Sequence, residues 1–298
     1  QVYAVLANNY PRPIPVPVKN LRPARETCEQ CHWPQQFYAR NLLIEKHFLS
    51  DEENTEWDIM LEMKIDASYS ALGLQEGIHW HINPDVKIEF LNHPDQDGII
   101  QWVKFTNRKT QETTIYNYED DPANDSILIN SSIRTMDCID CHSRPSHEYK
   151  SPAKYIDLAF TAGKLPAGLP SLKYIAMYVL SKEYNSTDSA FYYIEKEINE
   201  FYENSYPEIY SLKKGKIEKA ISSIKKEFRK NTFPEMKVNW AVYPDHISHI
   251  ESNGCFRCHD GKHKSRDGNT ISKDCNLCHN ILGQGTPDSL QKTAIYES

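Results

Sequence analysis

Four short motifs of cysteine and histidine are the residues whose types and spacing indicate a definite chemistry. In each motif two cysteines are separated by two residues, and a histidine follows directly. Thiols three residues apart project from one turn of chain, so both can form thioethers to the vinyl groups of one porphyrin, and the adjacent histidine can ligate its iron. The motifs are Cys28, Cys31 and His32; Cys138, Cys141 and His142; Cys255, Cys258 and His259; and Cys275, Cys278 and His279.

Two other uses of paired cysteines compete with this interpretation. Zinc knuckles close a site with four ligands and do not require a histidine directly after the second cysteine. Disulfides persist in exported proteins and require no histidine either. Because the histidine is present in all four motifs, and the motifs use all eight cysteines, we predict four covalently bound c-type haems.

Composition and charge limit the class of protein. The chain of 298 residues is 39% hydrophobic, which is enough for a core once four apolar porphyrins are added. Its formal net charge is −7, and each ferric haem with neutral ligands and ionised propionates adds about −1. A basic surface for nucleic acid is therefore absent, and no apolar run approaches the roughly 20 residues of a membrane span.

The start of the chain bears on the compartment. It begins with Gln1 instead of methionine, which suggests that a leader has been removed. Because c-type haem is attached outside the cytoplasmic membrane, we expect an exported protein, either periplasmic or extracellular.

The elements that must position the motifs follow from hydrophobic periodicity. Between residues 56 and 119 apolar residues alternate with polar ones, and turn signals occur at 93–98 and 107–111, which predicts a small antiparallel sheet without a haem motif. Residues 188–204 and 208–230 have a helical period and are separated at Tyr206-Pro207. We therefore predict an α+β, haem-dominated fold in which a small sheet subdomain, a helical insert and irregular loops surround the haems.

The chain divides into segments by this pattern. Proline at every second position from Pro11 to Pro17 predicts an extended strap. The predicted segments are the N-terminal strap 1–27, the first haem site 28–55, the antiparallel β subdomain 56–120, the second haem site 121–150, the helical insert 151–235, the third and fourth haem sites 236–282 and the C-terminal tail 283–298.

The second axial position of each iron decides between electron transfer and catalysis. Eight of the twelve histidines lie outside the motifs, which is more than four irons need. A methionine ligand would raise the potential, and two of the five methionines, Met60 and Met63, fit strand positions. We therefore predict bis-histidine ligation and low potentials. The eight remaining histidines are His47, His79, His81, His93, His147, His246, His249 and His263.

Spacing narrows the pairing of these histidines. Ligands on opposite faces of one haem, with iron–nitrogen bonds of roughly 2 Å, have α-carbons on the order of 11 to 13 Å apart. Four residues span about 13 Å only when fully extended. His263 is therefore not expected to ligate the haem of His259, nor His147 that of His142. We expect each to reach a neighbouring haem, which would hold the rings in a relay.

The other candidates are weighed by their expected elements. On a strand, His79 and His81 would face one side and serve two haems, or one haem and a propionate. His93 falls in a predicted turn and is expected to be solvated. His246 and His249 would share a helix face, and we expect one of them to be a ligand. No haem can be assigned to His47 from spacing, and a surface role stays open.

Several stretches resemble the multihaem c-type cytochromes of metal-respiring bacteria, in particular the soluble part of those with a NapC/NirT-type quinol-oxidising module. The stretches are 20–34, 77–81, 134–142 and 233–240, together with the opening segment. The resemblance spans most of residues 13 to 282 and implies electron transfer outside the cytoplasmic membrane. It implies no ligand at His93 or His246, and distal histidines at His47, His79, His81, His147, His249 and His263.

The sequence departs from that family in one respect. Such cytochromes place a membrane anchor and further haems ahead of this portion, and we expect instead a free-standing tetrahaem conductor. Its expected partners are other redox proteins as electron donor and acceptor. Ends held by neighbouring subunits would give self-association, and head-to-tail contacts would propagate into an extracellular filament. Nucleic acid and a membrane span are not expected.

Three functions compete. The leading hypothesis is a non-enzymatic electron conduit through closely packed bis-histidine haems. The alternative is a multihaem reductase of nitrite, hydroxylamine or a sulfur compound, which needs one iron with an open site and nearby acid–base groups. A third is a redox-linked docking protein that binds partners through its sheet. The eight spare histidines, and the absence of lysine in place of any motif histidine, favour the conduit.

Overall fold

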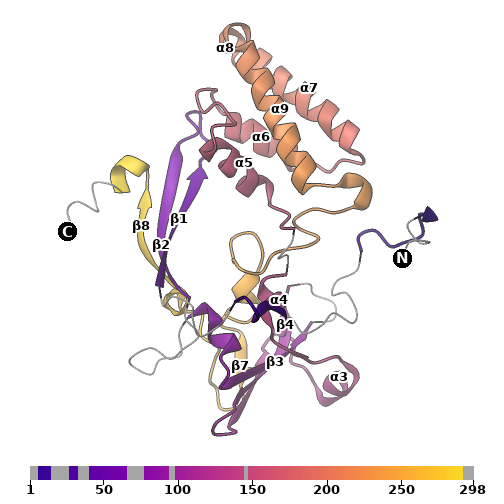
Figure 1. Ribbon diagram of the computed structural model, residues 1–298, viewed down its shortest axis with the longest axis vertical. Coiled ribbons are helices and arrows are strands. Elements are labelled where there is room, and N and C mark those ends of the chain that lie inside the picture. Colours follow the sequence, from indigo (N-terminus) through magenta and orange to yellow (C-terminus); the bar gives the residue numbers. More distant parts are fainter. Residues whose placement is uncertain are drawn as a thin grey trace.

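The computed structural model describes residues 6–14, 27–32, 40–65, 77–93, 98–143 and 147–290. In Figure 1 a cluster of helices lies at one end of the molecule and a five-stranded sheet at the other. A three-stranded sheet runs along one side between them. The fold is therefore of mixed α+β type, with two antiparallel sheets where one was predicted.

The three-stranded sheet has the order β1-β2-β8. It consists of β1 (Arg40–Phe48), β2 (Glu56–Lys64) and β8 (His279–Gly285), and both pairings are antiparallel. Asn41, Met63 and His279 lie opposite one another in the register, so their side chains share one face of the sheet. The last motif histidine is thus held by a sheet strand.

The five-stranded sheet has the order β6-β3-β4-β5-β7. Its core contains the alternating residues Val86, Ile88 and Phe90 of β3, together with Ile100 and Val103 of β4, and all five are at most 6% exposed. The strands are β3 (Val86–Asn92), β4 (Ile100–Asn107), β5 (Thr113–Tyr118), β6 (Arg134–Thr135) and β7 (His263–Ser265).

The prediction of one sheet within residues 56–120 was wrong. β2 pairs with β1 and β8, whereas β3, β4 and β5 pair with one another and with β6 and β7. Period-2 alternation identifies a strand but does not name its partner, because pairing is decided by tertiary packing. Strands from both ends of the chain therefore join these sheets, and one of them begins at a motif histidine.

Five helices form the cluster at the other end. They are α5 (Pro152–Thr161), α6 (Leu172–Leu180), α7 (Thr187–Ser205), α8 (Pro207–Leu212) and α9 (Lys214–Asn231). The predicted break at Tyr206-Pro207 is confirmed, since Pro207 is the first residue of α8. The predicted second helix is divided again at Lys213, which lies between α8 and α9.

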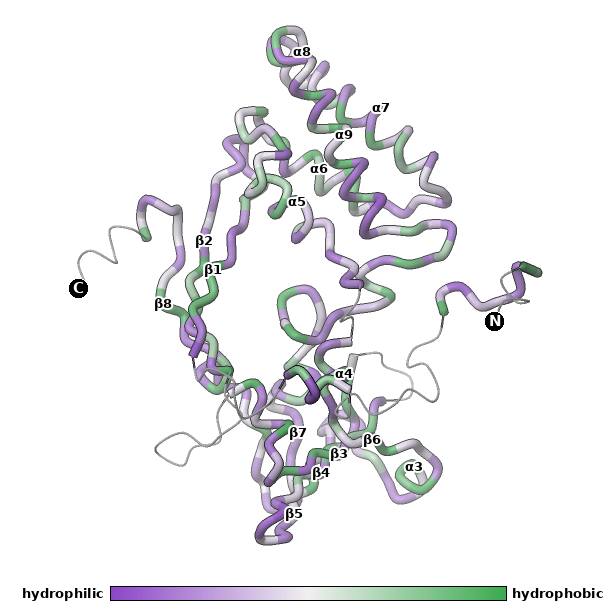
Figure 2. The backbone as a smooth tube through the Cα atoms, in the orientation of Figure 1, coloured by the Kyte–Doolittle hydropathy of each residue, from purple (hydrophilic) through white to green (hydrophobic). Residues whose placement is uncertain are grey.

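Amphipathic periodicity explains the packing of this cluster. Ile194, Ile198 and Tyr202 of α7 recur every four residues and are all 0% exposed. Ile217 and Ile224 of α9 are equally buried, and Figure 2 shows apolar and polar positions alternating along both helices. Burial of each such side chain contributes about 1.5 to 3 kcal/mol relative to exposure. The helical cluster thus has a core of its own.

Short elements complete the described chain. No helix among the described residues is long and apolar enough to cross a membrane. The short elements are η2 (Ile78–Ile82), α3 (Asp125–Asn130), α4 (Cys138–Cys141), η3 (Pro234–Met236), η4 (Gly254–Arg257) and η5 (Cys275–Leu277).

Candidate haem sites

Each cysteine motif forms a tight turn. In the first three motifs the histidine N–H donates to the carbonyl of the first cysteine, four residues earlier, which brings both cysteines to one turn of chain. These hydrogen bonds are His32 to Cys28 at 2.8 Å, His142 to Cys138 at 2.8 Å and His259 to Cys255 at 3.0 Å. In the fourth motif the Cys278 N–H donates to the Cys275 carbonyl at 3.3 Å.

The geometry does not support disulfides or zinc knuckles. All eight cysteines are free thiols, and among the described residues no three His, Cys, Asp or Glu side chains converge as metal ligands. Burial raises the pKa of Cys138 and of Cys258 to about 12. The histidine that follows each pair, which neither a disulfide nor a zinc knuckle requires, is what favours thioether attachment.

His79 lies opposite the motif histidine His142. Their rings are nearly parallel, at 19°, with centroids 6.4 Å apart. Two imidazoles that bind one iron from opposite sides, with bonds of roughly 2 Å, have centroids roughly 6 Å apart. Nδ1 of His79 lies 2.8 Å from the carbonyl oxygen of Ile65, so it donates there and leaves Nε2 with its lone pair, as in most metal-binding histidines.

His249 lies opposite His279 in the same way. The ring centroids are 6.2 Å apart and the planes differ by 26°. Burial, with a smaller contribution from His249, lowers the pKa of His279, which favours the neutral form that ligates metal. Phe256 of the third motif stacks on His249 at 4.4 Å. The third motif thus fixes the ring that faces the fourth.

His81 lies near the third motif histidine, His259. The centroids are 5.7 Å apart and the planes are perpendicular, at 89°. Rotation about an iron–nitrogen bond changes this angle without moving the nitrogen, so the pair is compatible with one iron. Nδ1 of His81 lies 3.0 Å from the Ile78 carbonyl and Nδ1 of His259 lies 2.7 Å from that of Ser272. Burial lowers the pKa of His81 to about 4.

His79 and His81 were expected on a strand. They lie instead on the 3₁₀ helix η2. With three residues per turn, positions two apart point in different directions, and the two rings accordingly face different motifs. Gly77, with φ of +100°, precedes η2, and its N–H donates to the Leu277 carbonyl at 2.9 Å. This hydrogen bond ties η2 to the fourth motif.

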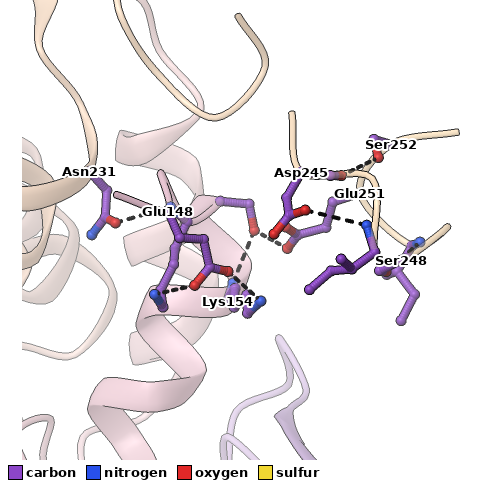
Figure 3. Close-up of polar contacts among 11 residues, drawn as sticks. Glu148, Lys154, Asn231, Asp245, Ser248, Glu251 and Ser252 are labelled. Carbon is purple, nitrogen blue, oxygen red and sulfur yellow. Dashed lines mark hydrogen bonds and ion pairs between the residues drawn. The ribbon is translucent and has the colours of Figure 1, made fainter. Parts of the chain in front are cut away.

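The segment that carries His246 and His249 is also not the predicted helix but a loop. Figure 3 shows how it is attached to α5. The Ser151 hydroxyl donates to Glu251 and accepts from the Lys154 N–H at 3.1 Å, so the N-cap of α5 holds the loop. Nearer its start, the same loop is attached to the second motif, because the His246 N–H donates to the Cys141 carbonyl at 3.2 Å.

The structure gives His263 a different place from the one expected. The side chain is 0% exposed, with Nδ1 3.0 Å from the Asp260 carboxylate and Nε2 2.6 Å from the Ile100 carbonyl. Both partners are acceptors, and these contacts link β7 to β4. The expected reach of His263 to a neighbouring haem stays a prediction, which these contacts do not favour.

The remaining histidines differ in their surroundings. His93 was expected to be solvated, but it is buried. It is 7% exposed, and its Nε2 lies 2.8 Å from the Asp121 carboxylate. His47 has Nδ1 3.5 Å from the Asp157 carboxylate, and its buried Nε2 has no hydrogen-bond partner among the described residues. His147 is exposed and stacks on Tyr149 at 4.5 Å.

The four motifs are neighbours in chain order. Burial is the main cause of the raised pKa of Cys138, Cys141 and Cys278, and a cysteine of an adjacent motif adds to each shift. Cys28 of the first motif acts on Cys138, and Cys255 of the third motif acts on both Cys141 and Cys278. The second motif is therefore near both the first and the third, and the fourth is near the third.

Some residues of these sites carry no sequence signal. The Nδ1 atoms of His79, His81 and His259 donate to backbone carbonyls of Ile65, Ile78 and Ser272, and any residue type supplies a carbonyl. The Ser151–Glu251 contact joins residues 100 positions apart. Only the serine before Pro152 is visible in sequence, as an N-cap followed by proline.

The chain was compared with known proteins. No protein-family model and no solved structure matches it. It is 41% identical over 286 residues to "Cytochrome c-type protein ImcH" of Geobacter sulfurreducens, an alignment that covers 95% of this chain and 55% of that protein. The chain thus spans about half the length of this curated relative.

Proposed function

We propose, from the relationship of this chain to a c-type cytochrome over 95% of its length, that it is a tetrahaem electron-transfer protein that acts outside the cytoplasmic membrane. The eight cysteines would hold four haems as thioethers. His32, His142, His259 and His279 would supply the proximal ligand of each iron. The bound haems would supply reversible one-electron chemistry.

The observation that carries this proposal is the set of facing histidine pairs. Three of the four motif histidines have a second imidazole at 5.7 to 6.4 Å between ring centroids. Because both axial positions of those irons would be filled, substrate has no open coordination site there, and the arrangement favours electron transfer over reduction of a small molecule. The proposed distal ligands are His79, His81 and His249.

His147 and His47 are the candidates for the haem of His32. His147 packs with Tyr149 and Phe233, and Tyr149 contacts Tyr243, whose hydroxyl donates to the Ile14 carbonyl at 2.6 Å. Ile14 is therefore linked to His147 through Tyr243 and Tyr149, which favours His147. The buried Nε2 of His47 keeps that residue as the second candidate.

The chain's own residues would tune and orient the haems. The carbonyls that accept from Nδ1 of His79, His81 and His259 fix the ring tautomer and raise ligand basicity. Adjacency of the motifs in chain order supports a relay from the first haem to the fourth.

Spectroscopy on the purified protein tests the proposal. Mass spectrometry should find four covalent haems, and electron paramagnetic resonance of the oxidised protein should show low-spin iron only. A high-spin ferric signal that responds to nitrite in the unmodified protein would support the reductase hypothesis and contradict the proposal of an electron-transfer protein.

A further inference from the structure

The side chain of Arg257 joins the second and third cysteine motifs. Arg257 lies inside the third motif, between Cys255 and Cys258. Its Nε donates to the Gly254 carbonyl at 3.0 Å, and its Nη2 donates at 2.8 Å to the carbonyl of Asp140, which lies inside the second motif. One guanidinium therefore bridges two attachment turns that are far apart in the sequence.

The guanidinium is suited to this bridge. It is planar, presents five N–H donors in a fixed fork, and is not deprotonated in proteins. Both acceptors, on Gly254 and Asp140, are neutral carbonyl oxygens. These hydrogen bonds hold the side chain in place without neutralising it, so a permanent positive charge is fixed between the two motifs.

The charge of Arg257 acts on cysteines of both motifs. Burial raises the pKa of Cys141, Cys255 and Cys258, and Arg257 opposes this rise at all three. It has the largest single charge effect at each of these thiols. Carboxylates act in the opposite direction with smaller individual effects, namely Asp140 and Asp245 at Cys141 and Asp260 at Cys258.

We propose that Arg257 raises the reduction potentials of the second and third haems together. The inference rests on the proposed tetrahaem function. With two neutral axial ligands, ferric iron has one more positive charge than ferrous iron, so a fixed cation near the attachment points disfavours the ferric state. One side chain would thus shift two members of the relay in the same direction.

Redox titration of the complete haem-loaded protein, followed by absorption, tests this role. In Arg257→Gln two of the four midpoint potentials should shift downward, while the other two stay. Arg257→Lys keeps the charge but loses the planar fork, and should leave all four potentials close to those of the unmodified protein. The matched control Arg108→Gln removes an exposed arginine in the turn between β4 and β5, and should change none.

The third haem can be followed by itself. In His81→Ala we expect the haem of His259 to be high-spin, so its absorption differs from that of the three low-spin haems. Addition of Arg257→Gln to this variant should lower the midpoint potential of that high-spin haem. An unchanged potential there would contradict the proposal.

The two substitutions of Arg257 separate charge from structure. Four unchanged potentials in Arg257→Gln would overturn the proposal, as would a fall in Arg257→Lys as large as that in Arg257→Gln. Where Arg257→Gln does not retain four haems, Arg257→Lys decides: unchanged potentials support the role of the charge, and lowered ones overturn it. Failure of the proposed function would appear separately, as fewer than four haems in the unmodified protein.

Discussion

His81 illustrates how single residues prepare these sites. Its Nδ1 is taken by the Ile78 carbonyl, its pKa is lowered to about 4 mainly by burial, and its ring lies 5.7 Å from that of His259. Tautomer, charge state and position therefore all favour Nε2 as a ligand. His263 differs, because both of its ring nitrogens lie within hydrogen-bond distance of oxygen acceptors.

Replacement of His81 should open one axial position. In His81→Ala we expect one haem of the four to become high-spin in the oxidised state, because no second imidazole remains opposite His259. Electron paramagnetic resonance and absorption spectra measure this change. The control His93→Gln, at a buried histidine that pairs with Asp121, should keep all four haems low-spin. Four low-spin haems in His81→Ala would contradict the assignment.

His263 should matter for stability instead. His263→Ala leaves the Ile100 carbonyl and the Asp260 carboxylate without their donor, at a cost of about 1 to 3 kcal/mol for each group that stays buried. Denaturant unfolding should show the loss, while the spectra stay low-spin. The surface control Lys219→Ala should change stability by less than about 0.5 kcal/mol. A new high-spin signal in His263→Ala would show that this histidine does ligate iron.

At the scale of elements, the N-cap of α5 is shared between the helical cluster and a haem site. Ser151→Ala removes the cap and the contact with Glu251 together, so we expect a loss of about 1 kcal/mol from the cap and an altered low-spin signal of the haem at His279. Ser186→Ala, at the N-cap of α7, should cost about as much stability without a spectral change. Identical spectra in both variants would show that the N-cap of α5 does not position the loop that carries His249.

Gly254 is the backbone position on which the same loop depends. It has φ of +42°, and a Cβ there would lie 1.6 Å from the Ser248 carbonyl oxygen. Gly254→Ala should therefore displace the loop and broaden the signals of the third and fourth haems. Gly268 also has positive φ, +82°, but open space around it, so Gly268→Ala should cost only about 1 to 2 kcal/mol. Equal effects of the two substitutions would show that backbone strain at positive φ, and not the contact with the Ser248 carbonyl, causes the spectral change.

The sequence predicted what local patterns encode and missed what tertiary contacts decide. The motifs, the strands near residues 86–118 and the break before Pro207 depend on neighbours in the chain. The placement of β2 beside β8 and the 3₁₀ form of η2 depend on residues 200 or more positions away, such as Leu277, whose carbonyl accepts from the Gly77 N–H. Facing pairs such as His79 and His142 could not be chosen from spacing for the same reason.

At the scale of the whole molecule, the helical cluster contacts the loop that carries His249 and the three-stranded sheet. The loop contact is Ser151–Glu251. At the sheet, Phe48 stacks on Phe160 at 4.7 Å and its N–H donates to Asp157 at 3.2 Å, and Asn54 donates to the Leu169 carbonyl at 2.8 Å. The cluster core itself contains no motif residue. We infer that the helices are a scaffold for the conducting part.

Self-association stays a prediction. The tail 291–298 and most of the strap 1–27 lie outside the described residues, so the contacts expected of the two ends have no structural test. If head-to-tail contacts form, electron microscopy of the purified protein should show filaments. Monodisperse globular particles would contradict the prediction.

The order of the facing histidines along the chain has a consequence for assembly. His79 precedes His142, His81 precedes His259, and His249 precedes His279. A polypeptide that emerges from its N-terminus would therefore already have exported the distal imidazole when each of these three haems is attached. If these pairs hold haem as proposed, each of the three haems would find both of its histidines in chain that is already present, and its maturation would not have to wait for later segments.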